Sequence, residues 1–243
     1  MPGEQAGRLT GAIGTALLVT VVVGSGIMAT NLSPDNVGLQ LLYNSLATAM
    51  GLTVLILHFG PESGAHFNPV VSFVDWLLGH RYRHGLPLRD VAAYAGAQTL
   101  GAIAGAILAN LMYGLAPVQI STHHRVSAGV LLAEVVATAG LVGLIFALAR
   151  SGRAPLSAAA VGAYIGTAYW YTSSTSFANP AVTVGRIFSD TFAGIAPVSV
   201  LPFIAAQLVG CLLGALLVRA LYPDVGEATD DVVVAHLDYQ QRP

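Results

Sequence analysis

The sequence has no lysine, a single cysteine (Cys211) and few charges: only 9% of its 243 residues are Asp, Glu, Lys or Arg. One cysteine excludes a framework of intrachain disulfides. Soluble domains carry about 25% charged residues, so this low fraction argues against a soluble globular protein. The sequence also has neither a basic cluster nor a set of nucleophile, base or metal-ligating residues. It therefore gives no support for nucleic-acid binding or for an enzyme.

The sequence is instead rich in long apolar stretches. Hydrophobic residues make up 55% of the chain, and the mean hydropathy is +0.70. A helix needs about 20 predominantly apolar residues to cross the hydrocarbon core of a bilayer. We therefore predict an all-α membrane protein with six spanning helices, at about 11–30, 38–59, 91–113, 128–149, 155–173 and 199–221.

Two tripeptides, Asn68-Pro69-Val70 and Asn179-Pro180-Ala181, each follow a loop of small residues and precede a short apolar stretch. Asn is a strong N-cap residue, and Pro fits the first turn of a helix because its missing N–H would have no partner there. The stretches 69–79 and 180–188 are too short to cross a bilayer. We predict two re-entrant half-helices whose positive N-terminal ends meet in mid-membrane, where they orient a neutral solute and repel cations.

The two halves of the chain resemble each other. The motif Ala97-Gln98-x-x-Gly101-x-x-x-Gly105-Ala106 recurs as Ala206-Gln207-x-x-Gly210-x-x-x-Gly214-Ala215, and the offset of 109 residues nearly matches the 111 between Asn68 and Asn179. Because each half has three spans, the halves must have opposite orientations, which predicts an inverted repeat. We assign residues 11–222 to one transmembrane domain, with repeats at about 11–115 and 126–222, between the N-terminal residues 1–10 and an acidic tail, 223–243.

The distribution of arginines predicts the orientation in the membrane. If the N-terminus is inside the cell, eight of the ten arginines lie on the cytoplasmic side, and only Arg125 and Arg186 lie outside. The positive-inside rule therefore favours cytoplasmic N- and C-termini. We expect a multi-pass protein of the inner (plasma) membrane, in contact with membrane lipids.

The motifs resemble those of the major intrinsic protein family, the aquaporins and aquaglyceroporins, over about residues 9–222. The resemblance rests on Ser63-Gly64-Ala65-His66-Phe67-Asn68-Pro69, on the second Asn-Pro-Ala, on Gly51-Leu52-Thr53-Val54-Leu55 and on the two Gln-x-x-Gly motifs. It implies a right-handed bundle of six spans and two half-helices, and a homotetramer in which each subunit has its own pore. It also implies passive passage of small neutral solutes and water, with no cofactor.

Departures from the family pattern concern the pore. Val70 replaces the Ala of the first Asn-Pro-Ala, and we expect only a modest effect on the cap. Val182 stands where the family typically has an Arg that narrows the outer constriction and repels cations. By resemblance, the other constriction positions are Met50, Ser176 and Thr167, with Tyr169 as the alternative to Thr167. Such a filter would be wider and less charged than a water-selective one.

Four polar residues near the half-helices have roles that the sequence leaves open. Asp75 and Arg186 each lie seven residues after their Asn. Each is either a vestibule residue, where Arg186 would place positive charge at the outer side, or a structural residue at the membrane interface or in an ion pair. His66 either faces the cytoplasmic side of the pore or is structural. We expect Glu134, which has Gly11 at the corresponding place in the first half, to accept hydrogen bonds from a loop backbone.

The predicted function is a passive channel for small neutral solutes such as glycerol and arsenous acid, with some water. The arsenic role rests on resemblance to a bacterial subgroup that lacks the filter Arg. A water-selective channel is the first alternative. An ion- or proton-coupled transporter is a second, since inverted repeats with broken helices also occur there, and a gated ion channel is a third.

Overall fold

The computed structural model describes residues 2–225, apart from the side chains of residues 2–4, 62 and 63. Most of the predicted acidic tail, residues 226–243, lies outside the described residues. The described chain is helical and has no strand: its elements are α1 (Pro2–Leu32), α2 (Val37–Ser63), α3 (Pro69–Gly79), α4 (Leu88–Met112), α5 (Ala128–Arg150), η1 (Ala154–Leu156), α6 (Ser157–Tyr171), α7 (Pro180–Gly185), η2 (Arg186–Phe188) and α8 (Pro197–Leu221).

Five of these helices, α1, α2, α4, α5 and α8, are long and apolar enough to cross a membrane. The predicted span at 155–173 is only partly matched, because α6 has 15 residues, about 23 Å at 1.5 Å per residue. Pro155 lies in the 3-10 turn η1 before α6, and the chain leaves the helix at Thr172, whose backbone is extended. The fifth predicted span is therefore a short helix extended by η1.

The half-helices begin at the predicted prolines, Pro69 and Pro180. Helix α3 has 11 residues, whereas α7 has six and continues into the 3-10 turn η2. Neither element alone approaches the length of a bilayer span. Both begin inside the bundle, at the buried residues Asn68 and Asn179.

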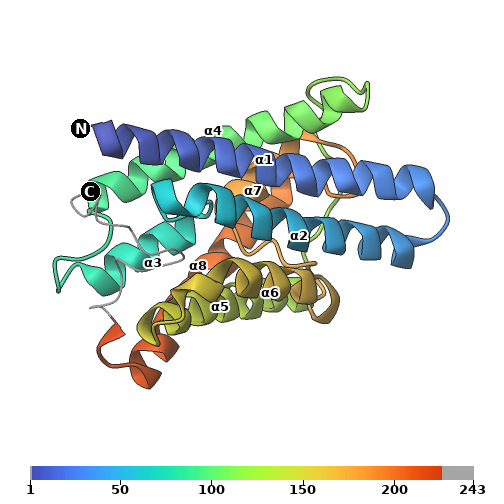
Figure 1. Cartoon of the computed structure of the whole chain (residues 1–243). Helices are drawn as coiled ribbons and strands as arrows, with labels where there is room; N and C mark the ends of the chain where they lie inside the picture. The colour runs from blue at the N-terminus through green and yellow to red at the C-terminus, as the bar shows by residue number, and fades with distance from the viewer. Residues whose placement is uncertain (1, 226–243) are drawn as a thin grey trace.

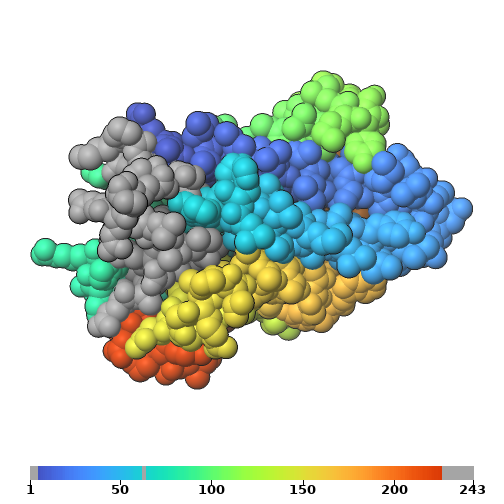
Figure 2. Space-filling view, viewed as in Figure 1, coloured from blue at the N-terminus to red at the C-terminus, as the bar shows by residue number. Residues whose placement is uncertain are grey.

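The halves of the bundle run in opposite directions (Figure 1). Helix α1 runs from left to right in this view and its counterpart α5 from right to left, and the start of α1 and the end of α8 lie at the same end of the bundle. Helix α1 packs on α4 and α5 on α8, while α7 packs on α4 and α3 on α8. Each half-helix thus contacts the last helix of the other half as well as that of its own half. The space-filling view shows α2 beside α6, the contact that joins the halves on this face (Figure 2).

The repeated glycines explain how closely these helices approach. A Cβ atom on Gly101 or Gly105 would overlap with the backbone carbonyl of Ala12 or Ala16 in α1. The equivalent glycines of α8, Gly210 and Gly214, meet the backbone of α5 in the same way. Small residues at such positions let helix backbones pack directly on each other, which is how helices associate in a membrane.

A Gly101→Ala variant tests this packing. Its new methyl group would overlap with the Ala12 carbonyl, so we expect the free energy of unfolding to fall by about 1–3 kcal/mol, as in other overpacked sites. Gly96→Ala is the matched control, because Gly96 is in the same helix and nothing lies within 4 Å of its Cβ position. Thermal unfolding in detergent compares the two, and equal melting temperatures would contradict the role of this close approach.

Candidate functional site

Asn68 and Asn179 cap the two half-helices. The Asn68 side chain accepts a hydrogen bond from the N–H of Val70 at 3.1 Å. The Asn179 side chain accepts two, from Ala181 at 3.0 Å and Val182 at 3.2 Å. Both asparagines have extended backbone conformations, as N-cap residues usually do. Substitution of the usual Ala by Val70 leaves the first cap in place.

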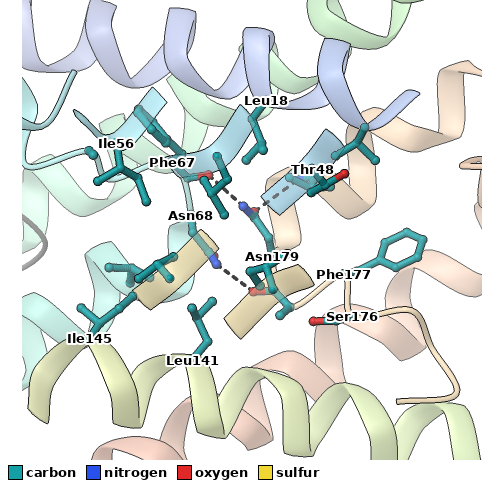
Figure 3. A pocket seen from close by; sticks show the side chains of 18 of the residues that line it. Leu18, Thr48, Ile56, Phe67, Asn68, Leu141, Ile145, Ser176, Phe177 and Asn179 are labelled. Atoms are coloured by element: carbon teal, nitrogen blue, oxygen red, sulfur yellow. Dashed lines mark hydrogen bonds between the residues drawn. The ribbon is translucent and has the colours of Figure 1, made fainter. Parts of the chain in front are cut away.

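The two asparagines also bind the opposite loop reciprocally (Figure 3). Asn68 Nδ2 donates to the carbonyl of Ala178 at 2.7 Å, and Asn179 Nδ2 donates to the carbonyl of Phe67 at 2.8 Å. Each acceptor directly precedes the other asparagine in the sequence. The N-termini of α3 and α7 are therefore joined at one point by a pair of equivalent hydrogen bonds. A carboxamide has two N–H donors, so each Asn keeps one for a solute.

The loop before α7 is held by a buried acid. The Glu134 carboxylate of α5 accepts hydrogen bonds from the N–H groups of Phe177 and Ala178, both at 2.9 Å, and from Gln207 at 2.7 Å. Gln207 also donates to Thr183 at 2.9 Å. The prediction that Glu134 accepts from a loop backbone is confirmed. These bonds hold Ser176 and Ala178 at positive φ values of 48° and 46°, which non-glycine residues adopt rarely.

The loop before α3 is held differently, because the first half has no such acid. Gln98 of α4, the counterpart of Gln207, donates to the carbonyl of His66 and to Ser72. Gly11 lies at the place that corresponds to Glu134, and a Cβ on it would be 3.7 Å from the His66 carbonyl. Gln98 thus binds its pore loop directly, whereas Gln207 supports the other loop through Glu134.

A cavity of about 70 Å³ surrounds the two asparagines. Its walls are largely apolar: Leu18 and Val22 from α1, Leu52 and Ile56 from α2, Leu141 and Ile145 from α5, and Val161 and Ile165 from α6. Its polar groups come mainly from the half-helices and the loop before α7. Figure 3 shows Leu141 and Ile145 on one side of the asparagine pair and Ile56 on another. The lining residues include no carboxylate and no histidine.

The constriction differs from the prediction at two positions. Thr48 of α2 and Tyr169 of α6 line the cavity, and their hydroxyl groups are 3.2 Å apart. The assignment of Met50 and Thr167 is wrong, since Met50 is 62% exposed and Thr167 is exposed. A residue two positions along a helix is turned by about 200°, so each lies on the face opposite its neighbour in the cavity. Tyr169 was the stated alternative to Thr167.

A recurring spacing could have identified Thr48. Thr48, Leu52 and Ile56 follow one another at intervals of four residues, and all three line the cavity. Residues at this spacing share one helix face. The signal is weak by itself, because the lipid-facing side of α2 is also apolar and shows the same spacing.

Ser176 and Val182, the other two predicted filter residues, both line the cavity. The Ser176 hydroxyl has no hydrogen-bond partner among the described residues, and Val182 is 5% exposed. A buried hydroxyl without a partner is costly, so this group is available to bind a small molecule in the cavity. Val182 contributes an apolar, uncharged side chain to this part of the cavity wall.

The three candidate vestibule residues have different surroundings. Asp75 is buried and accepts a hydrogen bond from the N–H of Leu86 at 2.7 Å, which holds the loop after α3. His66 is buried against Tyr94 and Ser72. Neither is among the residues that line the central cavity, and their assignment to a vestibule stays a prediction. Arg186 does line it.

A second cavity, of about 300 Å³, lies at the end of the bundle that carries the 113–127 loop, which we call the outer end. Arg125, Arg186 and the histidines His123 and His124 line it. Asp190 lies at the rim of this outer cavity, where its carboxylate accepts a hydrogen bond from the Thr122 N–H at 2.8 Å. That backbone hydrogen bond lowers the pKa of Asp190, with a smaller contribution from His123.

Comparison with known proteins agrees with this geometry. The family model for "Major intrinsic protein" matches residues 7–176 and 155–241. The chain is 48% identical over 210 residues to the aquaglyceroporin AqpS of Rhizobium meliloti, covering 86% of this chain and 87% of that protein. It is 31% identical over 228 residues to aquaporin Z of Brucella melitensis, covering 86% and 94%.

The fold is also similar to a solved structure. The X-ray structure of the aquaglyceroporin from Plasmodium falciparum superposes with a TM-score of 0.66, covering 93% of this chain and 99% of the other. The sequence identity of 17% means that this likeness concerns the fold alone.

The unequal caps give a testable difference. We expect Asn179→Ala to lower the free energy of unfolding more than Asn68→Ala, because Asn179 caps two N–H groups and Asn68 caps one. Each variant loses a cap, worth about 1 kcal/mol, and a buried hydrogen bond, worth about 1 kcal/mol more. Thermal unfolding in detergent measures both.

Asn36→Ala is the control for this comparison. Asn36 caps the exposed start of α2 by accepting from Leu39 at 3.0 Å, so its loss should cost about 1 kcal/mol or less. The reciprocal contact would be discounted as a stabilising element if all three variants unfolded at the same temperature.

Proposed function

Because the chain belongs to the major intrinsic protein family, a family of membrane channels, we propose that it passes small neutral polyhydroxyl solutes passively. Glycerol and arsenous acid are the solutes we propose, with water as a lesser permeant. The observation that carries this proposal is the uncharged Val182 in the wall of a cavity to which the paired asparagines contribute donors.

The chemistry of the cavity supports this solute class. A small polyol has hydroxyl groups along a carbon backbone, so it suits a passage with donors on one side and apolar walls on the other. Asn68 and Asn179 supply the donors, and Leu52, Ile56 and Leu141 supply apolar wall. Arsenous acid is uncharged at neutral pH and resembles a small polyol in shape and donors.

The names of relatives point the same way. AqpS of Rhizobium meliloti is named an aquaglyceroporin. A protein of Citrobacter freundii that is 28% identical over 207 residues is named a propanediol uptake facilitator. Both names describe passage of small polyols, and we extend that substrate class to this chain.

Passive transport is supported by the absence of a titratable coupling group in the passage. A coupled transporter needs an intramembrane acid or base that changes its charge during the cycle. The lining residues of the central cavity include no Asp, Glu or His, and Glu134 is fully buried, with three hydrogen bonds. We therefore favour a channel over a transporter.

We also propose that the chain forms a homotetramer in the inner membrane with both termini in the cytoplasm. The shared end of the bundle for the start of α1 and the end of α8 supports termini on one side (Figure 1). The arginine distribution supports the cytoplasmic side. Large exposed apolar residues such as Leu100, Leu201 and Leu216 supply surface for lipid or for neighbouring subunits.

Permeability of proteoliposomes tests the solute class. We expect wild-type protein to pass glycerol and arsenous acid quickly, and Val182→Arg to reduce both by about tenfold or more, because a long cationic side chain narrows the passage. Stopped-flow light scattering measures water, glycerol and arsenous acid on the same vesicles. Fast water with negligible solute flux in the wild type would instead identify a water-selective channel.

A second set of variants tests which residues form the constriction. Thr48→Ala removes a hydroxyl group that meets Tyr169 across the passage, so we expect several-fold faster glycerol flux. Met50→Ala is the matched control on the same helix, since Met50 lies on the outer face and its loss should leave flux unchanged. A larger effect of Met50→Ala than of Thr48→Ala would restore the assignment made from the sequence.

A further inference from the structure

Arg186 is common to the central cavity and the outer cavity. It begins η2, directly after α7, four residues beyond Val182, or about 6 Å farther along a helix axis. Its side chain lines both the central cavity and the outer cavity. Although it carries a full charge, Arg186 is only 2% exposed. A cation buried in the walls of two cavities needs an explanation, because burying a charge is costly.

The contacts of Arg186 leave part of its guanidinium free. Nε donates to the carbonyl of Ala193, and Cζ lies 3.5 Å from the centre of the Phe177 ring. Among the described residues, the two Nη atoms have no hydrogen-bond partner. Arg186 also forms no ion pair with any of these residues. The donors not used by the protein therefore belong to the side chain that the two cavities share, a position that we call the outer aperture.

Arg125 provides a comparison within the same site. It donates from Nε to Gly194 at 2.7 Å and from Nη2 to Phe192 at 2.8 Å, and its Cζ lies 5.4 Å from the Phe177 ring. The two arginines thus bind three consecutive carbonyls, those of residues 192–194. Arg125 lines only cavities at the outer end, whereas Arg186 also reaches the central one.

Among the described residues, no carboxylate forms an ion pair with either arginine. Glu134 is the nearby acid, and its two oxygens accept hydrogen bonds from neutral groups, the N–H groups of Phe177 and Ala178 and the amide of Gln207. Its one negative charge therefore offsets only part of the two positive charges. Asp190 is exposed at the rim, where it binds Thr122. The aperture is therefore positive, and a positive group in a low-dielectric wall opposes cations far more than it would in water.

We propose that Arg186 is the charge filter of this pore: its guanidinium excludes cations at the outer aperture and offers Nη donors to neutral solutes that enter. The inference rests on the proposed function, because it assumes that the central cavity conducts. In this arrangement Val182 sets the width of the passage and Arg186 sets its charge. Size selection and charge selection are then separated by about one helical turn.

The test measures cation leak and solute flux on the same proteoliposomes. Arg186→Met removes the charge and keeps most of the length. We expect potassium and proton leak, read with an entrapped pH dye and a potassium gradient, to rise about tenfold or more, with glycerol flux retained or increased. Arg186→Lys keeps the charge, so it should keep the leak low.

Arg125→Met is the matched control, because it removes a charge and two contacts to the same 192–194 segment from a residue that does not line the central cavity. We expect its leak to stay close to wild type. Equal leaks from Arg125→Met and Arg186→Met would overturn the proposal, since they would show that both arginines only hold the loop. Unchanged leak in Arg186→Met would overturn it as well.

Two further variants cover the case in which Arg186→Met does not fold. Arg186→Gln is neutral but keeps a donor for the Ala193 carbonyl, and it should leak as Arg186→Met does. Adding Val182→Arg to the Arg186→Gln variant should suppress the leak again, because a charge returns one turn away. A leak unaffected by this second charge would contradict the charge mechanism.

The outcomes also separate this inference from the proposed function. If wild-type vesicles pass water but not glycerol or arsenous acid, the proposed solutes are wrong, and the leak of the Arg186 variants still tests the charge filter. If wild-type vesicles pass these solutes and Arg186→Met does not leak, the proposed function stands and the charge filter fails.

Discussion

The pair of hydrogen bonds between Asn68 and Ala178 and between Asn179 and Phe67 is the contact on which the rest of the structure depends. Each asparagine caps its own half-helix and binds the loop of the other half. Irregular backbone at membrane depth is stable only where it is buried or lines a wet cavity. The reciprocal contact satisfies this condition for both loops at once and fixes the helix N-termini at the centre of the passage.

The surrounding helices pack closely enough to enclose the two half-helices. Glycines in α4 and α8 let these helices contact α1 and α5 at backbone distance, so the bundle closes around two short helices without large side chains at the contacts. Gln98 and Gln207, in the same repeated motif as those glycines, hold the two pore loops. One motif thus supplies both the packing face and the polar support of each half.

The site was predictable where it depends on local chemistry and less so where it depends on helix rotation. The caps at Asn68 and Asn179 follow from short-range rules, and Glu134 stood out as an acid in an apolar helix. Met50 and Thr167 were assigned by alignment to a family pattern, and a shift of two residues put them on the wrong faces. Asp75 and Arg186 occupy equivalent sequence positions, yet one supports a loop and the other reaches the cavities.

The sequence by itself determined the class of fold, the two half-helices and their asparagine caps, because these depend on hydrophobic length, on the Asn-Pro pairs and on the repeat. Only the tertiary structure decided which side chains line the passage, since that depends on the rotation of α2 and α6 against the loops. It also decided that Thr48 meets Tyr169 and that Arg186 lines two cavities. These contacts join residues far apart in the chain, and no local pattern specifies them.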